Sequence, residues 1–369
     1  MTSAGRIDID ADDIIQALEA NGFDDVRIDF APEGGWDDGL ERLAAVASVR
    51  RAAEAANVQA PGVWGERPAA GVGGASVRLK SPQSPDALNS WLAAFTAVLG
   101  AEGRSGLVRA TRTVRLPGFV TGFTEPWITV FAAYDLAIAD PATPPTAVSE
   151  TLDALDLCRR AVAWTAQAGG EAYLSSGGMN QLVATDEAAA YLLTALHARS
   201  AASFTCVDAQ AGRASHLHVD ADGLVVYQFH DSSAAPAERF TRLRDAMTVD
   251  VERTRLAFAA LSPVRAYGWD ARLKGLPPLL EQPDGVLARN TPAWSEFVPD
   301  AHGVQLLTGR HLSRIPDLTG WTVRALTPDR SLVEAPDLAA WLAPGGPSEA
   351  ELAQARAAFG AALLPGRLP

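Results

Sequence analysis

The sequence predicts an α+β fold of two layered halves, with split β-α-β (ferredoxin-like) units, antiparallel hairpins and a proline-rich C-terminal region. Three observations predict it. Short apolar strand patterns alternate with helical patterns up to residue 210, residues 215–231 carry a hairpin pattern, and prolines interrupt the chain repeatedly from Pro263 onward.

The helix starts are indicated by capping residues. Asp10 precedes the first helical pattern, and Ser84 followed by Pro85 forms the start of a helix whose apolar residues keep helical spacing. Near the end of the chain, Ser348 with Glu351 three residues later forms a capping box. These positions therefore predict helices that begin at residues 10, 85 and 348.

The order of the elements predicts three segments, with a proline-rich connection at residues 141–145 as the main boundary. The second segment is expected to contain the hairpin and the longest helix. The segments are an N-terminal half at residues 1–140, a second half at residues 146–262 with the hairpin at 215–231 and a helix at 236–261, and an extension at residues 263–369 that packs on the second half.

Two further features concern the organisation of the chain. The glycines and prolines of residues 61–74 predict a linker or a mobile loop. The two halves share a strand–helix–strand–strand order without a repeat at the level of residues, so the pattern leaves open whether one half duplicates the other.

Composition limits the classes of function. The hydrophobic fraction of 48% and charged fraction of 20% are those of a globular protein, and two cysteines in 369 residues make no disulfide framework. The net charge of −13 and the pI near 4.9 disfavour a nucleic-acid partner. An acidic surface instead favours encounter with a basic protein.

The sequence also bears on location. No apolar run approaches the roughly 20 residues needed to cross a bilayer. The N-terminal residues Met1 to Arg6 carry one arginine with no apolar segment after it, which is not the pattern of a secretory signal. We therefore expect a cytoplasmic protein without a membrane partner.

The hairpin pattern has two distinguishable faces, because side chains alternate along a strand. One face is apolar if all odd positions point the same way, and the opposite, wetter face then carries His216, His218, Gln228 and His230. His216 and His218 lie roughly 6 to 7 Å apart on this basis, a spacing that one metal ion can share. His230 joins them only if even positions pair with even positions across the turn.

Three interpretations of this face stay open. It is a solvated or partner-contacting face, a pH-sensitive surface, or a zinc site formed by His216, His218 and His230. No carboxylate ligand lies nearby on the same face and the chain has no H-E-x-x-H helix. The interpretation that we favour therefore has no cofactor, with zinc as the alternative.

The C-terminal run from Gly303-Val304-Gln305-Leu306-Leu307-Thr308 through Trp321 to Ala339-Ala340-Trp341 resembles a segment of uncharacterised proteins of high-GC bacteria. Some of these proteins are similar to immunity proteins that accompany secreted toxins. The resemblance covers residues 303–341 and implies no catalytic residue. Trp321 and Trp341 are packing residues or aromatic anchors of an interface, and we take them as interface candidates.

These observations favour a non-enzymatic protein-binding module, in its sharpest form an immunity-type inhibitor of a basic toxin domain. One alternative is a metal-dependent hydrolase that uses the histidine face, with the metal lowering the pKa of a bound water. A structural subunit of a larger assembly is the other. The sequence does not identify the partner, the substrate or the oligomeric state.

Overall fold

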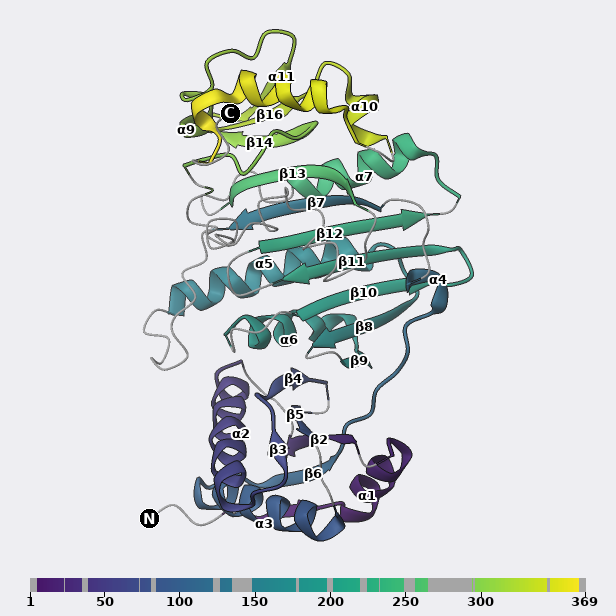
Figure 1. Cartoon of the computed structure of the whole chain (residues 1–369), viewed down its shortest axis with the longest axis vertical. Coiled ribbons are helices and arrows are strands. Elements are labelled where there is room, and N and C mark those ends of the chain that lie inside the picture. The colour runs from purple at the N-terminus through teal and green to yellow at the C-terminus, as the bar shows by residue number, and fades with distance from the viewer. Residues whose placement is uncertain are drawn as a thin grey trace. The chain divides into compact units, whose positions relative to one another are not determined.

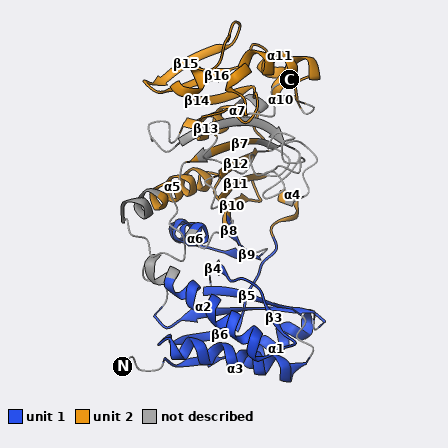
Figure 2. Cartoon of the chain, turned by 60° about the vertical axis from the view of Figure 1, so that its left-hand side comes forward, with its two compact units in different colours: residues 1–115, 140–144, 174–202 blue, residues 116–139, 145–173, 203–369 orange. Residues whose placement is uncertain are grey.

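The structure is a computed structural model of the chain. It describes residues 5–22, 24–34, 39–72, 74–80, 84–121, 127–134, 148–176, 179–197, 202–219, 224–231, 233–248, 256–264, 294, 296–343 and 346–364. By their internal contacts the residues form two compact units (Figure 2). The first comprises residues 1–115, 140–144 and 174–202, and the second comprises residues 116–139, 145–173 and 203–369.

The first unit contains a six-stranded sheet in the order β1-β6-β2-β5-β3, with β4 paired to β5. The strand β1 runs parallel to β6, whereas β2 is antiparallel to both β5 and β6. Its elements are β1 (Ile7–Ile9), α1 (Ala11–Ala20), β2 (Asp25–Pro32), α2 (Gly39–Gln59), β3 (Trp64–Gly65), β4 (Ala69–Gly71), β5 (Gly74–Lys80), α3 (Pro85–Ala101), β6 (Gly106–Ala110), β9 (Met179–Leu182) and α6 (Thr185–His197).

The second unit is built on a ten-stranded sheet in the order β15-β16-β14-β13-β7-β12-β11-β10-β8-β9. Residues 174–202, which include the end of β8 and all of β9, are counted with the first unit. The helix α5 packs on β11, and α7 packs on β7, β12 and β13 (Figure 1). The elements are α4 (Gly118–Thr121), β7 (Trp127–Tyr134), α5 (Val148–Ala166), β8 (Glu171–Ser176), β10 (Ala202–Asp208), β11 (Arg213–Val219), β12 (Leu224–Asp231), α7 (Pro236–Thr248), β13 (Leu256–Val264), β14 (Val304–Thr308), α9 (Gly309–Leu312), β15 (Thr322–Thr327), β16 (Arg330–Glu334), α10 (Leu338–Leu342), α11 (Glu349–Phe359) and the 3-10 turn η3 (Gly360–Ala362).

The predicted α+β class is confirmed, and the capping residues lie where the sequence placed them. The Asp10 side chain accepts the Asp13 N–H at 3.2 Å and starts α1, and Ser84 accepts the Ala87 N–H at 3.2 Å and starts α3. At α11 the Ser348 and Glu351 pair closes the capping box in both directions. Local hydrogen bonds of this kind need no tertiary partner, so short sequence patterns suffice to predict them.

Two predicted segments differ from the structure. The helix expected at residues 236–261 ends at Thr248, and residues 256–264 form the strand β13 between β7 and β14. A strand with neighbours on both sides is often apolar on both faces, so its run of apolar residues has no alternation to distinguish it from a buried helix. The predicted N-terminal half also extends too far, because β7 pairs with β12 and β13 in the second unit.

The glycine- and proline-rich residues 61–74 are part of the first unit's sheet instead of forming a linker. They contain β3 and β4, which pair with β5. The Val72 N–H donates to Gln181 Oε1 at 2.8 Å, and the Tyr191 hydroxyl donates to the Val72 carbonyl at 3.1 Å. The proline-rich residues 141–145, proposed as a boundary, lie outside the described residues.

One side chain fixes the short strand β3. Asn57 Oδ1 accepts the Gly65 N–H at 2.7 Å and the Trp91 indole N–H at 2.9 Å, while Asn57 Nδ2 donates to the Gly65 carbonyl at 2.9 Å. The Trp91 ring is buried in the core of the first unit, stacked on Phe95 with ring centroids 5.0 Å apart. Asn57 therefore joins the core to the edge of the sheet.

Replacing Asn57 with alanine is expected to lower the free energy of unfolding of the first unit by about 2 kcal/mol. The Gly65 N–H, the Gly65 carbonyl and the Trp91 indole N–H each lose their hydrogen-bond partner. Urea denaturation followed by circular dichroism measures it. Asn89→Ala is the matched control, because Asn89 is exposed on α3, and a change within about 0.5 kcal/mol is expected there. A loss for Asn57→Ala as small as the control's would contradict the prediction.

Candidate functional site

The structure places the predicted histidine face on β11 and β12. The two strands are antiparallel, with His216 opposite Gln228 and Ala214 opposite His230. Even positions therefore pair with even positions, as the hydrophobic pattern predicted, and His230 lies on the same face as His216 and His218. The turn itself, at residues 220–223, lies outside the described residues.

This face is buried and not solvated. His216, His218 and Gln228 are 2%, 2% and 0% exposed. The ring nitrogen His216 Nδ1 lies 2.8 Å from Thr205 Oγ1, His218 Nδ1 lies 2.8 Å from Ser203 Oγ, and Gln228 Nε2 donates to Thr129 Oγ1 at 3.0 Å. The polar side chains thus interact across β10, β11, β12 and β7. Because polar and apolar residues alternate along these strands, the pattern matches that of a strand with one solvent-exposed face. This is why the sequence predicted a solvated face.

The environment of these histidines disfavours charge. Burial, together with the neighbouring His218, lowers the pKa of His216 to about 3, so its imidazole is neutral at pH 7. Within the part of the chain that the structure describes, no group of three or more His, Cys, Asp or Glu side chains is placed to hold a metal ion. The structure brings His216 and His218 side by side without a third such ligand among those residues.

The two predicted interface tryptophans come together in the C-terminal part of the second unit. Trp321 directly precedes β15 and Trp341 lies on α10, and their ring centroids are 6.3 Å apart with the planes tilted by 60°. Trp321 also meets Phe359 of α11 edge to face at 5.2 Å. Trp341 is 9% exposed and belongs to the apolar core, while Trp321 is half-buried against it.

These rings line a concave site of about 500 Å³ that we call the tryptophan hollow. Its wall is formed by the loop before β15, the segment after β16, and one side of α11. It is lined by Asp317, Thr319, Trp321, Pro336, Asp337, Trp341, Glu351, Gln354, Ala355, Ala357 and Ala358. The volume lies within the range of small-ligand pockets in proteins.

Three carboxylates of the tryptophan hollow are held in place by local hydrogen bonds. Asp317 Oδ1 accepts from the Thr319 N–H at 2.7 Å and from its hydroxyl at 2.6 Å, and Asp337 Oδ1 accepts the Ala340 N–H at 3.3 Å. Glu351 Oε2 accepts the Ser348 N–H at 2.7 Å. Asp317 and Asp337 each use Oδ1 for these hydrogen bonds, and Ser348 is the partner of the Glu351 carboxylate.

The electrostatics of the hollow are one-sided. Hydrogen bonds from Thr319 lower the pKa of Asp317, and hydrogen bonds from Ser348 lower the pKa of Glu351, so both stay ionised at pH 7. Among the described residues that line the hollow there is no lysine and no arginine. Arg356, the arginine of α11, is engaged elsewhere with Asp300. The site therefore combines two indole rings with three carboxylates.

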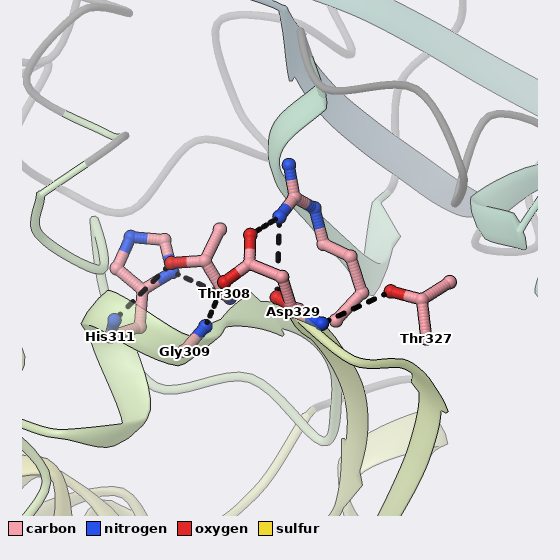
Figure 3. Close-up of polar contacts among 6 residues, drawn as sticks. Thr308, Gly309, His311, Thr327 and Asp329 are labelled. Atoms are coloured by element: carbon pink, nitrogen blue, oxygen red, sulfur yellow. Dashed lines mark hydrogen bonds and ion pairs between the residues drawn. The ribbon is translucent and has the colours of Figure 1, made fainter.

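The β15–β16 hairpin beside the hollow is fastened to α9 (Figure 3). The Gly309 N–H donates to the Asp329 carbonyl at 3.1 Å and lies 3.3 Å from Asp329 Oδ1. Within α9, the His311 N–H donates to Thr308 Oγ1 at 3.3 Å, and His311 Nδ1 accepts the Thr308 N–H at 3.2 Å. The Asp329 contacts hold the turn between β15 and β16 against α9.

Residue type alone marks the two tryptophans as interface candidates, whereas no sequence pattern marks the carboxylates that line the same hollow. The Ser348 and Glu351 capping box was recognised as a helix start, but its side chains gave no sign of facing a cavity. Asp337 is likewise the N-cap of α10. Their convergence depends on how α10 and α11 pack on the sheet, and no spacing along the chain reports that packing.

No family model matches this chain, and no curated protein matches it significantly. Among solved structures, the Pseudomonas aeruginosa T6SS protein PA0821 is similar over 65% of this chain and 76% of its own length, with 10% sequence identity and a TM-score of 0.39. A likeness at that TM-score carries no argument about function. Across the described residues, no helix combines the length and the apolar character required to traverse a bilayer.

Proposed function

We propose that this protein is a protein-binding module that recognises a basic partner through the tryptophan hollow. The observation that carries the proposal is the convergence of Trp321 and Trp341 with three fixed carboxylates in one concave site. Tryptophan is enriched among the residues that dominate binding energy at interfaces, above all in well-packed pockets. The half-buried Trp321 presents such a surface.

Charge supports a basic partner. The chain carries a net charge of −13, so long-range attraction speeds its encounter with a positively charged protein. At short range, the carboxylates of Asp317, Asp337 and Glu351 offer acceptors to lysine or arginine side chains. In its sharper form the proposal is an immunity-type inhibitor, which neutralises a basic toxin domain by covering the surface that the toxin uses. The resemblance of residues 303–341 to immunity-like proteins supports that form, and six of the eleven residues that line the hollow lie in this segment.

The test is quantitative capture of a partner by tagged full-length protein from a lysate of its own organism. We expect a stoichiometric partner of basic isoelectric point at low salt, released as ionic strength rises. The triple variant Asp317→Asn/Asp337→Asn/Glu351→Gln removes three charges from the hollow while its amides keep the capping acceptors, and it is expected to lose most of the partner.

The matched control carries three equivalent substitutions at exposed acids outside the hollow, Asp12→Asn/Asp86→Asn/Glu349→Gln. It changes the net charge equally and is expected to retain the partner. Equal recovery by the two triple variants would contradict a role for the hollow. Recovery of no stoichiometric partner by the unmodified protein would contradict the proposed function itself.

A further inference from the structure

We propose that the tryptophan hollow receives an arginine side chain of the partner, with its guanidinium against the two indole rings and its N–H groups directed to the surrounding carboxylates. This inference rests on the proposed function and names the group that the site recognises. It follows from three properties of the hollow: its aromatic walls, its fixed and charged carboxylates, and the arrangement of its described acids, which is not that of a metal site.

The aromatic walls favour a cation over a neutral group. Indole is the aromatic ring that attracts cations most strongly through its face. The two rings have centroids 6.3 Å apart and planes tilted by 60°, and both line the hollow, Trp321 half-buried and Trp341 9% exposed. A cation–π contact of this kind occurs elsewhere among the described residues, where the Arg314 guanidinium lies 4.5 Å from the centroid of the Phe297 ring.

The carboxylates supply acceptors that the chain itself leaves available. Asp317, Asp337 and Glu351 each use one oxygen for a local hydrogen bond, so the position of the carboxylate is fixed before a ligand arrives. Among the described residues, Oδ2 of Asp317 and of Asp337 has no hydrogen-bond donor and can accept from the ligand. No lysine or arginine stands among the described lining residues, so these residues include no cation that neutralises the carboxylates. Fixed acceptors lower the entropy lost on binding.

The arrangement of the described acids does not suit a metal ion. A metal ion needs its ligands within about 2 to 2.6 Å of one point. The described acids of the hollow do not form a group placed to do that. A guanidinium instead spreads five N–H donors around a plane several ångströms wide, and it stacks on aromatic faces while its edge makes hydrogen bonds. An ammonium group is smaller and more strongly hydrated, so it gains less from the indole walls.

The experiment uses the full chain labelled with 5-fluorotryptophan and the probe N-acetyl-arginine methylamide. The chain has nine tryptophans, and the variants Trp321→Phe and Trp341→Phe assign two of the nine fluorine resonances. We expect the probe to shift these two resonances with a dissociation constant of about 1 to 10 mM, as suits one anchored side chain. Trp64, which is exposed in the first unit, reports nonspecific binding and is expected not to shift.

Two further probes establish the chemistry. N-acetyl-lysine methylamide is expected to bind about fivefold more weakly, and the citrulline analogue, which has the shape of arginine without its charge, is expected not to bind. The triple variant Asp317→Asn/Asp337→Asn/Glu351→Gln is expected to weaken the arginine probe at least about tenfold, whereas the control triple variant leaves it unchanged. Circular dichroism confirms that each variant is folded.

The inference is overturned if the arginine probe leaves both resonances in place at about 50 mM, well above the expected dissociation constant, or if citrulline binds as well as arginine. Equal binding of lysine and arginine would also overturn it, because the planar group would then have no role. Partner capture that depends on the hollow without arginine binding would leave the proposed function standing and remove only this inference.

Discussion

Replacing Arg356 with alanine is expected to lower the free energy of unfolding of the second unit by about 3 kcal/mol. Arg356 of α11 donates from Nε to Asp300 Oδ1 at 2.8 Å, and its Nη2 pairs with Asp300 Oδ2. The Asp300 side chain is only 4% exposed. Burial acts to raise the pKa of Asp300, and hydrogen bonds from Arg356 with nearby charges outweigh it, so the net shift is downward. Without Arg356, an ionised carboxylate is left buried.

Urea denaturation at pH 7, followed by tryptophan fluorescence, measures the effect. Arg310→Ala is the control, because Arg310 pairs with Glu296 at 3.1 Å on the surface and its loss is expected to cost less than about 1 kcal/mol. Adding Asp300→Asn to Arg356→Ala is expected to recover part of the stability by removing the unpaired charge. A loss for Arg356→Ala no larger than that for Arg310→Ala would show that the pair does not hold α11.

The second large effect is a dependence of stability on pH that arises from His311. This side chain is fully buried, its Nδ1 accepts the Thr308 N–H, and its Nε2 lies 2.8 Å from the Trp294 carbonyl (Figure 3 shows the Thr308 contacts). Both contacts suit a neutral ring with its proton on Nε2. Burial lowers the pKa of His311 to about 4, although the hydrogen bond to Trp294 acts in the opposite direction.

Because the folded pKa lies below the unfolded value near 6.5, the unfolded chain binds the proton more tightly. The contribution of His311 is therefore complete above pH 6.5 and is lost as the pH falls through 4. Between pH 7 and pH 4.5 the loss is expected to be about 2.5 kcal/mol.

His311→Asn isolates this contribution, since asparagine offers an acceptor near the position of Nδ1 and does not titrate. The variant is expected to be less stable at pH 7 than the unmodified protein, because it gives up the hydrogen bond to Trp294. The difference between the two proteins is expected to shrink toward pH 4.5. Parallel stability curves, measured by urea denaturation across this range, would show that His311 does not titrate as proposed.

How far the sequence predicts this protein depends on whether a feature is local. The caps at Asp10, Ser84 and Ser348 follow from hydrogen bonds within a few residues, and the pairing of β11 with β12 follows from alternation along one hairpin. Trp321 and Trp341 were recognised as interface candidates by residue type.

Features that depend on distant segments were predicted less well. Residues 256–264 carry an apolar run compatible with either helix or strand, and only their pairing with β7 and β14 decides for a strand. Polar and apolar residues alternate along the hairpin in the same way whether its polar face is buried or exposed. The pattern therefore predicted a solvent-exposed face where the structure has a buried one. The carboxylates of the hollow are helix caps and turn residues by sequence, and their shared surroundings come from packing.

The buried polar side chains of the ten-stranded sheet have a consequence for how its strands are aligned. Thr205, His216, Gln228 and Thr129 lie level with one another on four adjacent strands. Sliding β12 by two residues would keep every side chain on its own face, yet it would place His216 and Thr129 opposite Val226 or His230 in place of Gln228. A buried amide or imidazole that loses its hydrogen-bond partner costs far more free energy than an apolar side chain moved by the same two residues. The four polar side chains therefore give the observed register of the four strands a lower free energy than registers shifted by two residues.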